Sequence, residues 1–346
     1  MFNPDKTKQF LHEILLIESP TGYTFNLIQH LNRKAQDYGF NTTINEKGNL
    51  IVHVKGQQAQ PKLGISAHVD TLGLMVRSIN SDGTLKVTTL GGPTTPTLDG
   101  EYCSVLTRDN QRIRGTILST SFSSHVHRDA NEKSRKVDDL MIRIDEVVRN
   151  KEDVEKLGIQ NGDIVAYDAK VEMGEAGFIK SRFLDDKASV AILFALLETL
   201  AKEKIVPNYD TDFIFSTYEE VGHGASHIPS DITTLLAVDM GCIGEDLACT
   251  EFDVSICAKD SSGPYDYQMI SQLVDIASAK KLSYALDIYP FYGSDASAAL
   301  RGGNNIRAAL IGPGVHASHG MERTHIKALE NTYHLILNYL TQKESN

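Results

Sequence analysis

Histidine and carboxylate side chains recur in this sequence where predicted strands end or predicted helices begin. In open α/β sheets, ligands bind in the crevice beyond the carboxyl ends of the strands. Several different strands can each place a side chain in this crevice, and these side chains then meet at one edge of the sheet. Imidazoles and carboxylates without cysteine suit a catalytic divalent site, such as one for zinc, cobalt or manganese. The candidates are His68, Asp185, Glu219, Glu220, Asp239 and His319.

Several carboxylates at one edge would repel one another unless cations neutralised them. Two divalent ions about 3.5–4 Å apart would do so and would activate a shared water molecule. Consecutive Glu219 and Glu220 point in opposite directions on a regular strand, so one can bind metal while the other acts as a base. Asp70 is placed to accept the second ring N–H of His68 and fix its tautomer. Each motif alone also has a structural explanation, such as helix capping by Asp185, but their combination favours a metal site.

The elements that must position these residues are two α/β segments with a β-rich segment between them. The region 75–170 holds short β-like runs separated by turn signals such as Asp82-Gly83, a spacing typical of a small barrel or sandwich. We therefore expect an α/β domain, formed by residues 1–73 and 177–346, that is interrupted by a β-rich insert at 74–176. Apolar periodicity predicts helices at 6–17, 23–38, 186–203 and 325–342, and buried strands at 50–54, 62–68, 212–217, 234–238 and 307–311.

Composition and charge narrow the classes of function. The 346 residues are 41% hydrophobic and 23% charged, which is ordinary for a globular protein. The net charge of −11 argues against a protein that grips nucleic acid, which normally needs a basic face. The longest apolar-rich stretch, at 188–200, is too short and too interrupted to span a membrane, and no secretory signal is visible at the N-terminus. We therefore expect a cytoplasmic protein that binds neither nucleic acid nor membrane.

The cysteines agree with a site built from histidine and carboxylate. None of them forms a C-x-x-C pair, so a disulfide framework or a cysteine zinc site has little support. Cys242 stands close to Asp239 and is interpreted as a small buried apolar residue. The four cysteines are Cys103, Cys242, Cys249 and Cys257.

Taken together, the motifs resemble metallopeptidase family 42, the glutamyl and deblocking aminopeptidases that include the tetrahedral aminopeptidases. The resemblance covers nearly the whole chain, and its combination of motifs is highly specific although each motif is not. It implies a zinc-peptidase-like α/β/α sandwich with a mixed central sheet, interrupted by a barrel-like insert domain. The motifs are Ser19-Pro20-Thr21-Gly22, Ala67-His68-Val69-Asp70, Leu184-Asp185-Asp186-Lys187, Glu219-Glu220-Val221-Gly222, Val238-Asp239 and Gly293-Ser294-Asp295-Ala296.

The same resemblance implies roles for the residues. Two divalent metal ions, Zn²⁺ or Co²⁺, would be bridged by Asp185, with Glu219 as the general base and Asp70 supporting catalysis. His316 is the alternative to His319, because the run that holds both histidines departs from the family's usual form. The reaction implied is removal of N-terminal residues from peptides by water that the two metal ions activate. The expected metal ligands are His68, Asp185, Glu220, Asp239 and His319.

The insert and the substrate pocket carry expectations of their own. By resemblance, the insert is a dimerisation and assembly module of a homo-oligomer, from a dimer up to a dodecamer. The wall of the pocket for the N-terminal residue is expected among Gly293, Asp295 and residues 315–323, and the preferred residue stays open.

Two other classes of function are alternatives. Metallopeptidase family 20, with its dipeptidases and deacylases, uses a similar ligand pattern, but its extra domain follows the Glu-Glu and Asp ligands. Here His68 and Asp185 are 117 positions apart and the insert lies between them, which favours family 42. Aspartyl aminopeptidases place their insert similarly in generally longer chains. The second class is a non-catalytic assembly protein that keeps the fold.

Overall fold

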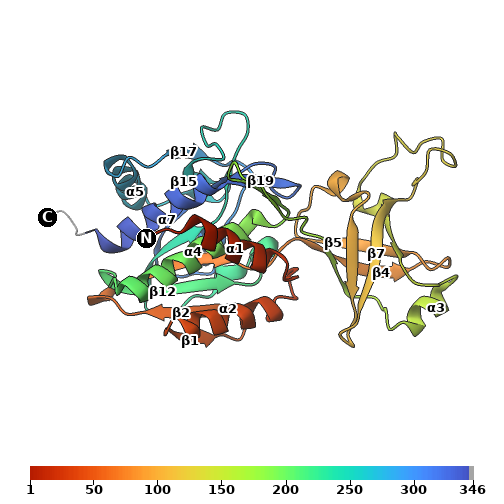
Figure 1. Ribbon diagram of the computed structural model, residues 1–346, viewed down its shortest axis with the longest axis horizontal. Coiled ribbons are helices and arrows are strands. Elements are labelled where there is room, and N and C mark those ends of the chain that lie inside the picture. Colours follow the sequence, from red (N-terminus) through yellow and green to blue (C-terminus); the bar gives the residue numbers. More distant parts are fainter. Residues whose placement is uncertain (343–346) are drawn as a thin grey trace. The chain divides into compact units, whose positions relative to one another are not determined.

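The computed structural model describes residues 1–342, which fall into two compact units (Figure 1). Unit 1 contains Met1–Asp70 and the chain from Lys170 onward, and unit 2 contains Thr71–Ala169. Unit 2 is therefore inserted between the two segments of unit 1. The insert limits suggested by the sequence, 74 and 176, each fall a few residues after these boundaries.

A mixed sheet forms the centre of unit 1. Its strands are β1 (Asn41–Ile44), β2 (Leu50–Val54), β3 (Gln58–His68), β12 (Tyr209–Ser216), β13 (Ile232–Val238), β14 (Gly241–Cys242), β15 (Val254–Asp260), β16 (Gly263–Pro264), β17 (Tyr284–Ile288) and β18 (Arg307–Val315). The main order is β1-β2-β12-β3-β13-β18-β15-β16, with β14 paired to β18 and β17 paired to β15. The inner strands β12, β3, β13 and β18 are parallel, so their carboxyl ends meet at one edge of the sheet.

Helices cover both faces of this sheet. They are α1 (Pro4–Leu15), α2 (Phe25–Asp37), α4 (Leu184–Glu203), α5 (Tyr267–Ala279), α6 (Asp295–Arg301) and α7 (Ile326–Thr341). The ring of Phe215 on β12 lies 5.0 Å from the ring of Phe194 on α4. Its neighbour Ile214 points to the other face, because side chains alternate along a strand, and joins a buried cluster with Ala299 of α6. Both faces are buried, which explains why the inner strands are almost continuously apolar in sequence.

A small sheet of three antiparallel strands stands beside the large one in unit 1. Its strands are β10 (Glu172–Met173), β11 (Phe178–Ser181) and β19 (Glu322–His325). In the register of β11 with β19, Ser181 lies opposite Glu322. This pairing brings the start of α4 and the segment after β18 together, although more than a hundred residues separate them in sequence.

Unit 2 is a closed barrel of antiparallel strands. Its strands are β4 (Gly73–Ile79), β5 (Leu85–Leu90), β6 (Tyr102–Leu106), β7 (Arg112–Ser119), β8 (Leu140–Ile144) and β9 (Ile164–Tyr167), in the order β4-β5-β8-β7-β6-β9. The unit also holds α3 (Lys151–Lys156) and the 3₁₀ turns η1 (Thr95–Leu98) and η2 (Val137–Asp139). Gly83, in the turn between β4 and β5, has φ +86°, a conformation that glycine adopts without steric cost.

The expected fold class is confirmed: a mixed central sheet lies between helices and is interrupted by a barrel. The expected helices and buried strands are all present, with ends that differ by a few residues. Along residues 1–342, none of the helices combines the length and the apolar character that crossing a membrane requires.

Close contact between β18 and the end of β13 fixes the position of Asp239. A Cβ atom added to Gly312 would lie 1.7 Å from the backbone oxygen of Asp239, so only glycine fits there. We expect Gly312→Ala to lower the free energy of unfolding by about 1–3 kcal/mol or more, because the backbone has to move apart. Urea or thermal unfolding measures this change.

Gly244→Ala is the matched control, because a Cβ atom at Gly244 meets no heavy atom within 4 Å. It should leave the unfolding midpoint nearly unchanged. Equal midpoints for the two variants would contradict the proposed steric constraint at Gly312.

Candidate metal centre

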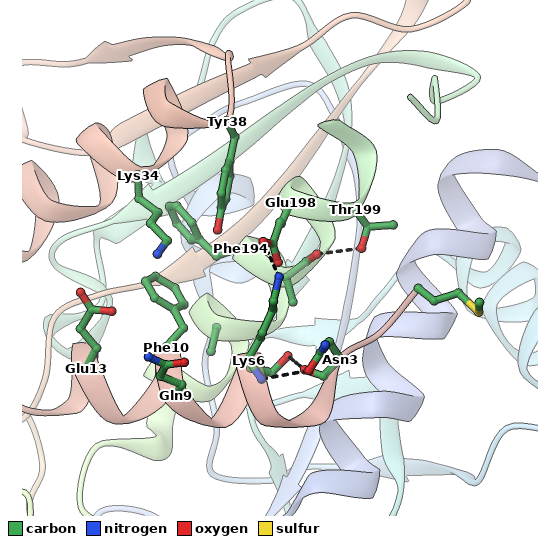
Figure 2. Close-up of a pocket in the computed structure, with 14 residues that line it drawn as sticks. Asn3, Lys6, Gln9, Phe10, Glu13, Lys34, Tyr38, Phe194, Glu198 and Thr199 are labelled. Carbon is green, nitrogen blue, oxygen red and sulfur yellow. Dashed lines mark hydrogen bonds and ion pairs between the residues drawn. The ribbon is translucent and has the colours of Figure 1, made fainter. Parts of the chain in front are cut away.

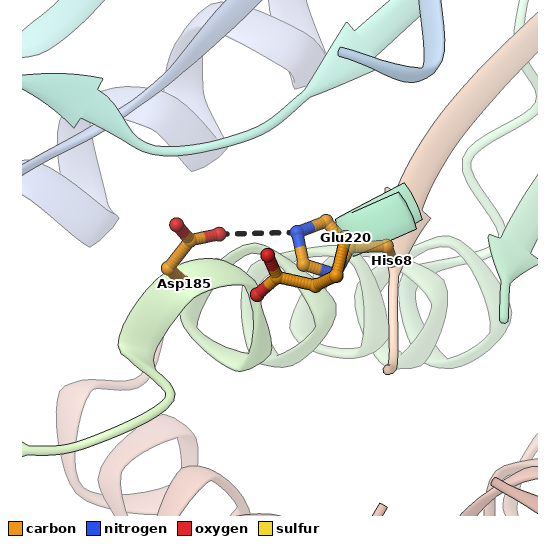
Figure 3. A group of neighbouring side chains, drawn as sticks. All are labelled: His68, Asp185 and Glu220. Carbon is orange, nitrogen blue, oxygen red and sulfur yellow. Dashed lines mark hydrogen bonds and ion pairs between the residues drawn. The ribbon is translucent and has the colours of Figure 1, made fainter. Parts of the chain in front are cut away.

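His68 is the last residue of β3 and lies at the centre of the candidate site (Figure 3). Its ring Nε2 is 3.0 Å from Asp185 Oδ1, 3.7 Å from Glu219 Oε2 and 4.0 Å from Asp239 Oδ2. Its Nδ1 is 2.9 Å from the backbone oxygen of Asp70 and 3.5 Å from the Asp70 carboxylate. Burial alone would lower the pKa of His68, but its hydrogen bonds with Asp185 and Asp70 raise that pKa well above the ordinary value.

Asp185 stands at the start of α4 with non-helical backbone angles, and its carboxylate faces two imidazoles. Oδ1 is 3.0 Å from His68 Nε2, whereas Oδ2 is 3.4 Å from His319 Nε2. The hydroxyl of Ser318 also donates to Oδ2, at 3.1 Å. Burial would raise the pKa of Asp185, but the two histidines hold it well below its usual range. The carboxylate of Asp185 therefore belongs to the cluster and does not serve merely as a cap of α4.

Glu219 and Glu220 diverge, but a 3₁₀ turn rather than a regular strand separates them. Strand β12 ends at Ser216, and the chain turns into η3 (Glu219–Val221), followed by η4 (Gly224–Ser226). Glu219 Oε2 faces His68, whereas Glu220 Oε2 is 3.6 Å from Nε2 of His319. The two glutamate side chains do point in different directions, as expected. The reason is the 3₁₀ turn, because the alternation of side chains along β12 ends before Glu219.

The carboxylate of Asp70 holds this turn through hydrogen bonds to its backbone. Oδ1 accepts the backbone N–H of Glu219 at 3.1 Å, and Oδ2 accepts that of Glu220 at 3.2 Å. The hydroxyl of Thr21 donates to Oδ2 at 2.7 Å. Because the backbone oxygen of Asp70 is the nearer partner of His68, this one residue positions the histidine with its backbone and both glutamates with its side chain.

The structure brings all six candidates of the sequence into one cluster. Ligand atoms of His68, Asp185 and Glu220 lie within 4.8 Å of one another, and so do those of His68, Glu219 and Asp239. His319 contacts the cluster through Asp185 and Glu220. His316 has an exposed side chain and forms a backbone bridge with Arg323.

Burial makes the charge in this cluster costly. Burial and the nearby Asp185 raise the pKa of Asp239 to about 7. Burial, together with neighbouring carboxylates, also raises the pKa of Glu219 and of Glu220 well above ordinary values. Buried carboxylates need a counter-charge, and imidazole with carboxylate oxygen is a donor set that suits Zn²⁺ or Co²⁺. The residues present therefore fit divalent cations.

A cavity of about 370 Å³ opens onto the cluster. Gly293 lines it, but Asp295 does not: its buried carboxylate accepts hydrogen bonds from the Ser216 hydroxyl and the Ala225 N–H. Cys242 also lines the cavity and is only half-buried, so its interpretation as a buried apolar residue is wrong. The lining includes Asp185, Glu219, Glu220, Asp239, Met240, Cys242, Phe291, Tyr292, Gly293, Arg301, Ser318 and His319.

Another cavity, of about 220 Å³, is lined by α1, α2 and α4 together with chain at their ends (Figure 2). None of the candidate residues lines it. Two of its charged groups form an ion pair, with Lys6 Nζ 3.4 Å from Glu198 Oε1, and Lys34 Nζ lies 5.0 Å from the centre of the Phe10 ring. It therefore offers no comparable set of donors.

Sequence reasoning missed two side chains beside the cluster. Ser318 donates to Asp185, and Tyr292, next to Asp239, donates to the backbone oxygen of Met240 at 3.2 Å. Both lie in loops without periodicity, and only the position of Ser318 next to His319 gave a signal.

Residues 48–335 of the chain match the protein family described as M42 glutamyl aminopeptidase. A protein of Bacillus subtilis (strain 168), named "Putative aminopeptidase YhfE", is 45% identical over 336 residues, which cover 97% of each chain. This match extends over almost the whole chain, including every candidate residue.

Solved structures share the fold. A TET aminopeptidase from a marine sediment archaeon (Thaumarchaeota) superposes with a TM-score of 0.88 at 19% identity, over 99% of this chain and 97% of that one. The TET1 peptidase of Pyrococcus horikoshii gives 0.85 at 22% identity, over 97% and 100%. At such identities the structural likeness establishes the fold alone.

Metal removal should make stability depend on pH. The folded protein holds a proton on Asp239 up to about pH 7, whereas an unfolded aspartate releases it near 3.8. A carboxyl group whose pKa is raised in the folded state stabilises the folded protein at low pH. This stabilisation is lost as the pH rises through the pKa of the folded state. We therefore expect the melting temperature of chelator-treated protein, followed by circular dichroism, to fall as the pH rises from 3.8 to about 7.

Asp239→Asn serves as the control: its amide does not titrate, so the slope should become shallower, and the raised pKa values of Glu219 and Glu220 account for what remains. Added Co²⁺ or Zn²⁺ should raise the melting temperature of the wild type most at the alkaline end. A slope unchanged in Asp239→Asn would show that Asp239 does not contribute to it.

Proposed function

Because this chain belongs to the M42 glutamyl aminopeptidase family and is an aminopeptidase of that hydrolase family, we propose that it works with two divalent metal ions. Zn²⁺ or Co²⁺ is the proposed metal, since the donor set holds imidazole and carboxylate and no thiolate. The observation that carries the proposal is the carboxylate of Asp185, whose two oxygens face two different imidazoles.

We assign one ion to each side of Asp185. His68 and Asp239 would hold the first ion with Asp185, and Glu220 and His319 would hold the second. The distances support this division, because Asp239 lies near His68 and Glu220 lies near His319. Asp185 would help to hold both ions, since its two oxygens face the two imidazoles.

The bound ions would supply positive charge that polarises the scissile carbonyl and lowers the pKa of water. Glu219 is the proposed general base: its Oε2 would take a proton from the attacking water and return it to the leaving amine. Burial raises the pKa of Glu219, which makes its carboxylate a stronger proton acceptor than an exposed glutamate. Asp70 contributes by fixing the orientation of His68 and of the turn that carries Glu219.

The proposed substrates are peptides, which would enter the cavity above the cluster with their N-terminal residue. For unit 2 we propose a role in dimerisation and assembly. The Pyrococcus horikoshii TET1 peptidase is described as assembling into a tetrahedron or a large octahedral shell. We propose a homo-oligomer here too, at work in the cytoplasm, and its mass can be measured by light scattering.

Release of p-nitroaniline from a panel of aminoacyl-p-nitroanilides tests the function. We expect wild-type protein with Co²⁺ or Zn²⁺ to release it, and a chelator to abolish the release. Glu219→Gln should fold and bind metal but lose most turnover, by roughly 10²–10⁴-fold, because the water has no base.

Two outcomes would contradict parts of this proposal. Glu219→Gln with nearly wild-type kcat would refute the assignment of the base. No release over the whole panel, with metal still bound, would instead favour a dipeptidase, a deacylase or an assembly protein.

The two histidines give a matched pair of variants for the last ligand. His319→Ala should raise the dissociation constant of one Co²⁺ ion by about 10-fold or more, because it removes a donor that faces Asp185 and Glu220. His316→Ala should leave the titration unchanged, since its side chain is exposed. The reverse order in a calorimetric titration would transfer the ligand role to His316.

A further inference from the structure

Glu322 is a buried carboxylate for which the proposed chemistry has no use. It begins β19 and is 2% exposed, whereas the next residue, Arg323, is exposed. In the small sheet it lies opposite Ser181, four residues before Asp185. The strand pairing therefore directs this carboxylate to the point where the chain enters α4.

Both oxygens of Glu322 accept backbone hydrogen bonds from proposed metal ligands. Oε2 accepts the N–H of Asp185 at 3.1 Å, and Oε1 accepts the N–H of His319 at 3.2 Å. These two residues belong to different segments, the start of α4 and the loop between β18 and β19. One side chain thus joins the two segments that hold the second proposed ion.

Both segments contain backbone that needs such support. Phe183, just before α4, has φ +69°, and Ala317 and His319 in the loop have φ +59° and +63°. Residues with a Cβ atom adopt this left-handed region at a cost, and they keep it only where surrounding interactions hold them. The hydrogen bond from His319 to Glu322 acts at one of these residues.

We propose that Glu322 is a positioning residue that sets the distance between Asp185 and His319 and thereby the affinity for metal. It would bind neither metal nor substrate, because both of its oxygens are engaged and it does not line the cavity. The inference rests on the proposed function in one respect, that Asp185 and His319 are metal ligands. A carboxylate is required because a glutamine amide has one acceptor and would turn an N–H group toward an N–H donor.

The test is a calorimetric titration of metal-free Glu322→Gln with Co²⁺. We expect the dissociation constant of at least one ion to rise by about 10- to 100-fold, the usual effect of removing a partner behind a metal ligand. The rise in melting temperature on adding Co²⁺ should shrink as well. At saturating Co²⁺, KM should stay near the wild-type value, because Glu322 does not touch substrate.

Glu251→Gln is the matched control, at a carboxylate in the turn before β15 that contacts the neighbouring residue of β19. Its carboxylate pairs with Arg323, the residue after Glu322, at 2.6 and 3.0 Å, and its backbone oxygen accepts the N–H of His325, so these contacts are with β19 and not with a proposed ligand. We expect its Co²⁺ titration to match the wild type. Should Glu322→Gln fail to fold, Glu322→Asp provides the same test, since it keeps two acceptors on a chain one methylene shorter and should also weaken Co²⁺ binding.

Each failure has its own signature. Unchanged Co²⁺ binding in the folded Glu322 variant, or an equal loss in Glu251→Gln, would overturn the role of Glu322. Wild-type protein that binds Co²⁺ tightly but releases no p-nitroaniline would instead refute the proposed function and leave the test of Glu322 readable.

Discussion

Burial of several carboxylates with two histidines at one sheet edge is the constraint on which the rest of unit 1 depends. An ion taken out of water loses roughly several kcal/mol of solvation even after relaxation, and like charges add repulsion. The folded chain offsets this with imidazoles: Asp185 lies between His68 and His319, and Glu219 and Glu220 each face one of them. The surrounding strands and turns hold these groups close together, and the resulting cluster of imidazoles and carboxylates suits cations.

The scaffold meets this constraint with two kinds of element. Parallel strands bring His68 and Asp239 to the same edge, and the glycine at 312 lets β18 approach the backbone of Asp239 closely. Hydrogen-bonded carboxylates then fix the irregular segments: Asp70 holds the turn of the two glutamates, and Glu322 holds the start of α4 and the loop of His319. Regular structure thus gives the approximate positions, and buried acceptors set the orientation.

The barrel of unit 2 (Thr71–Ala169) is built without such a buried cluster of charged groups. Along β7, buried side chains alternate with more accessible ones, and the turns of the unit carry residues that tolerate a positive φ. It contributes no residue to the metal cluster or to the cavity that opens onto it. The role in dimerisation and assembly that we propose for unit 2 is compatible with this separation from the cluster.

The sequence by itself determined which side chains could form the site and which elements carry them. Apolar periodicity located the strands and helices within a few residues, and residue types at strand ends selected all six members of the cluster. These features are local, so they can be read from neighbouring residues. The tertiary structure alone decided between His319 and His316 as the histidine in contact with the cluster.

Three further features also depended on the tertiary structure. It showed that Glu219 and Glu220 diverge on a 3₁₀ turn, and it buried Asp295 away from the cavity. It also gave Glu322 its place between two segments. Sequence patterns could not show these features, because the direction of a loop side chain depends on its backbone angles and on partners that are distant in sequence.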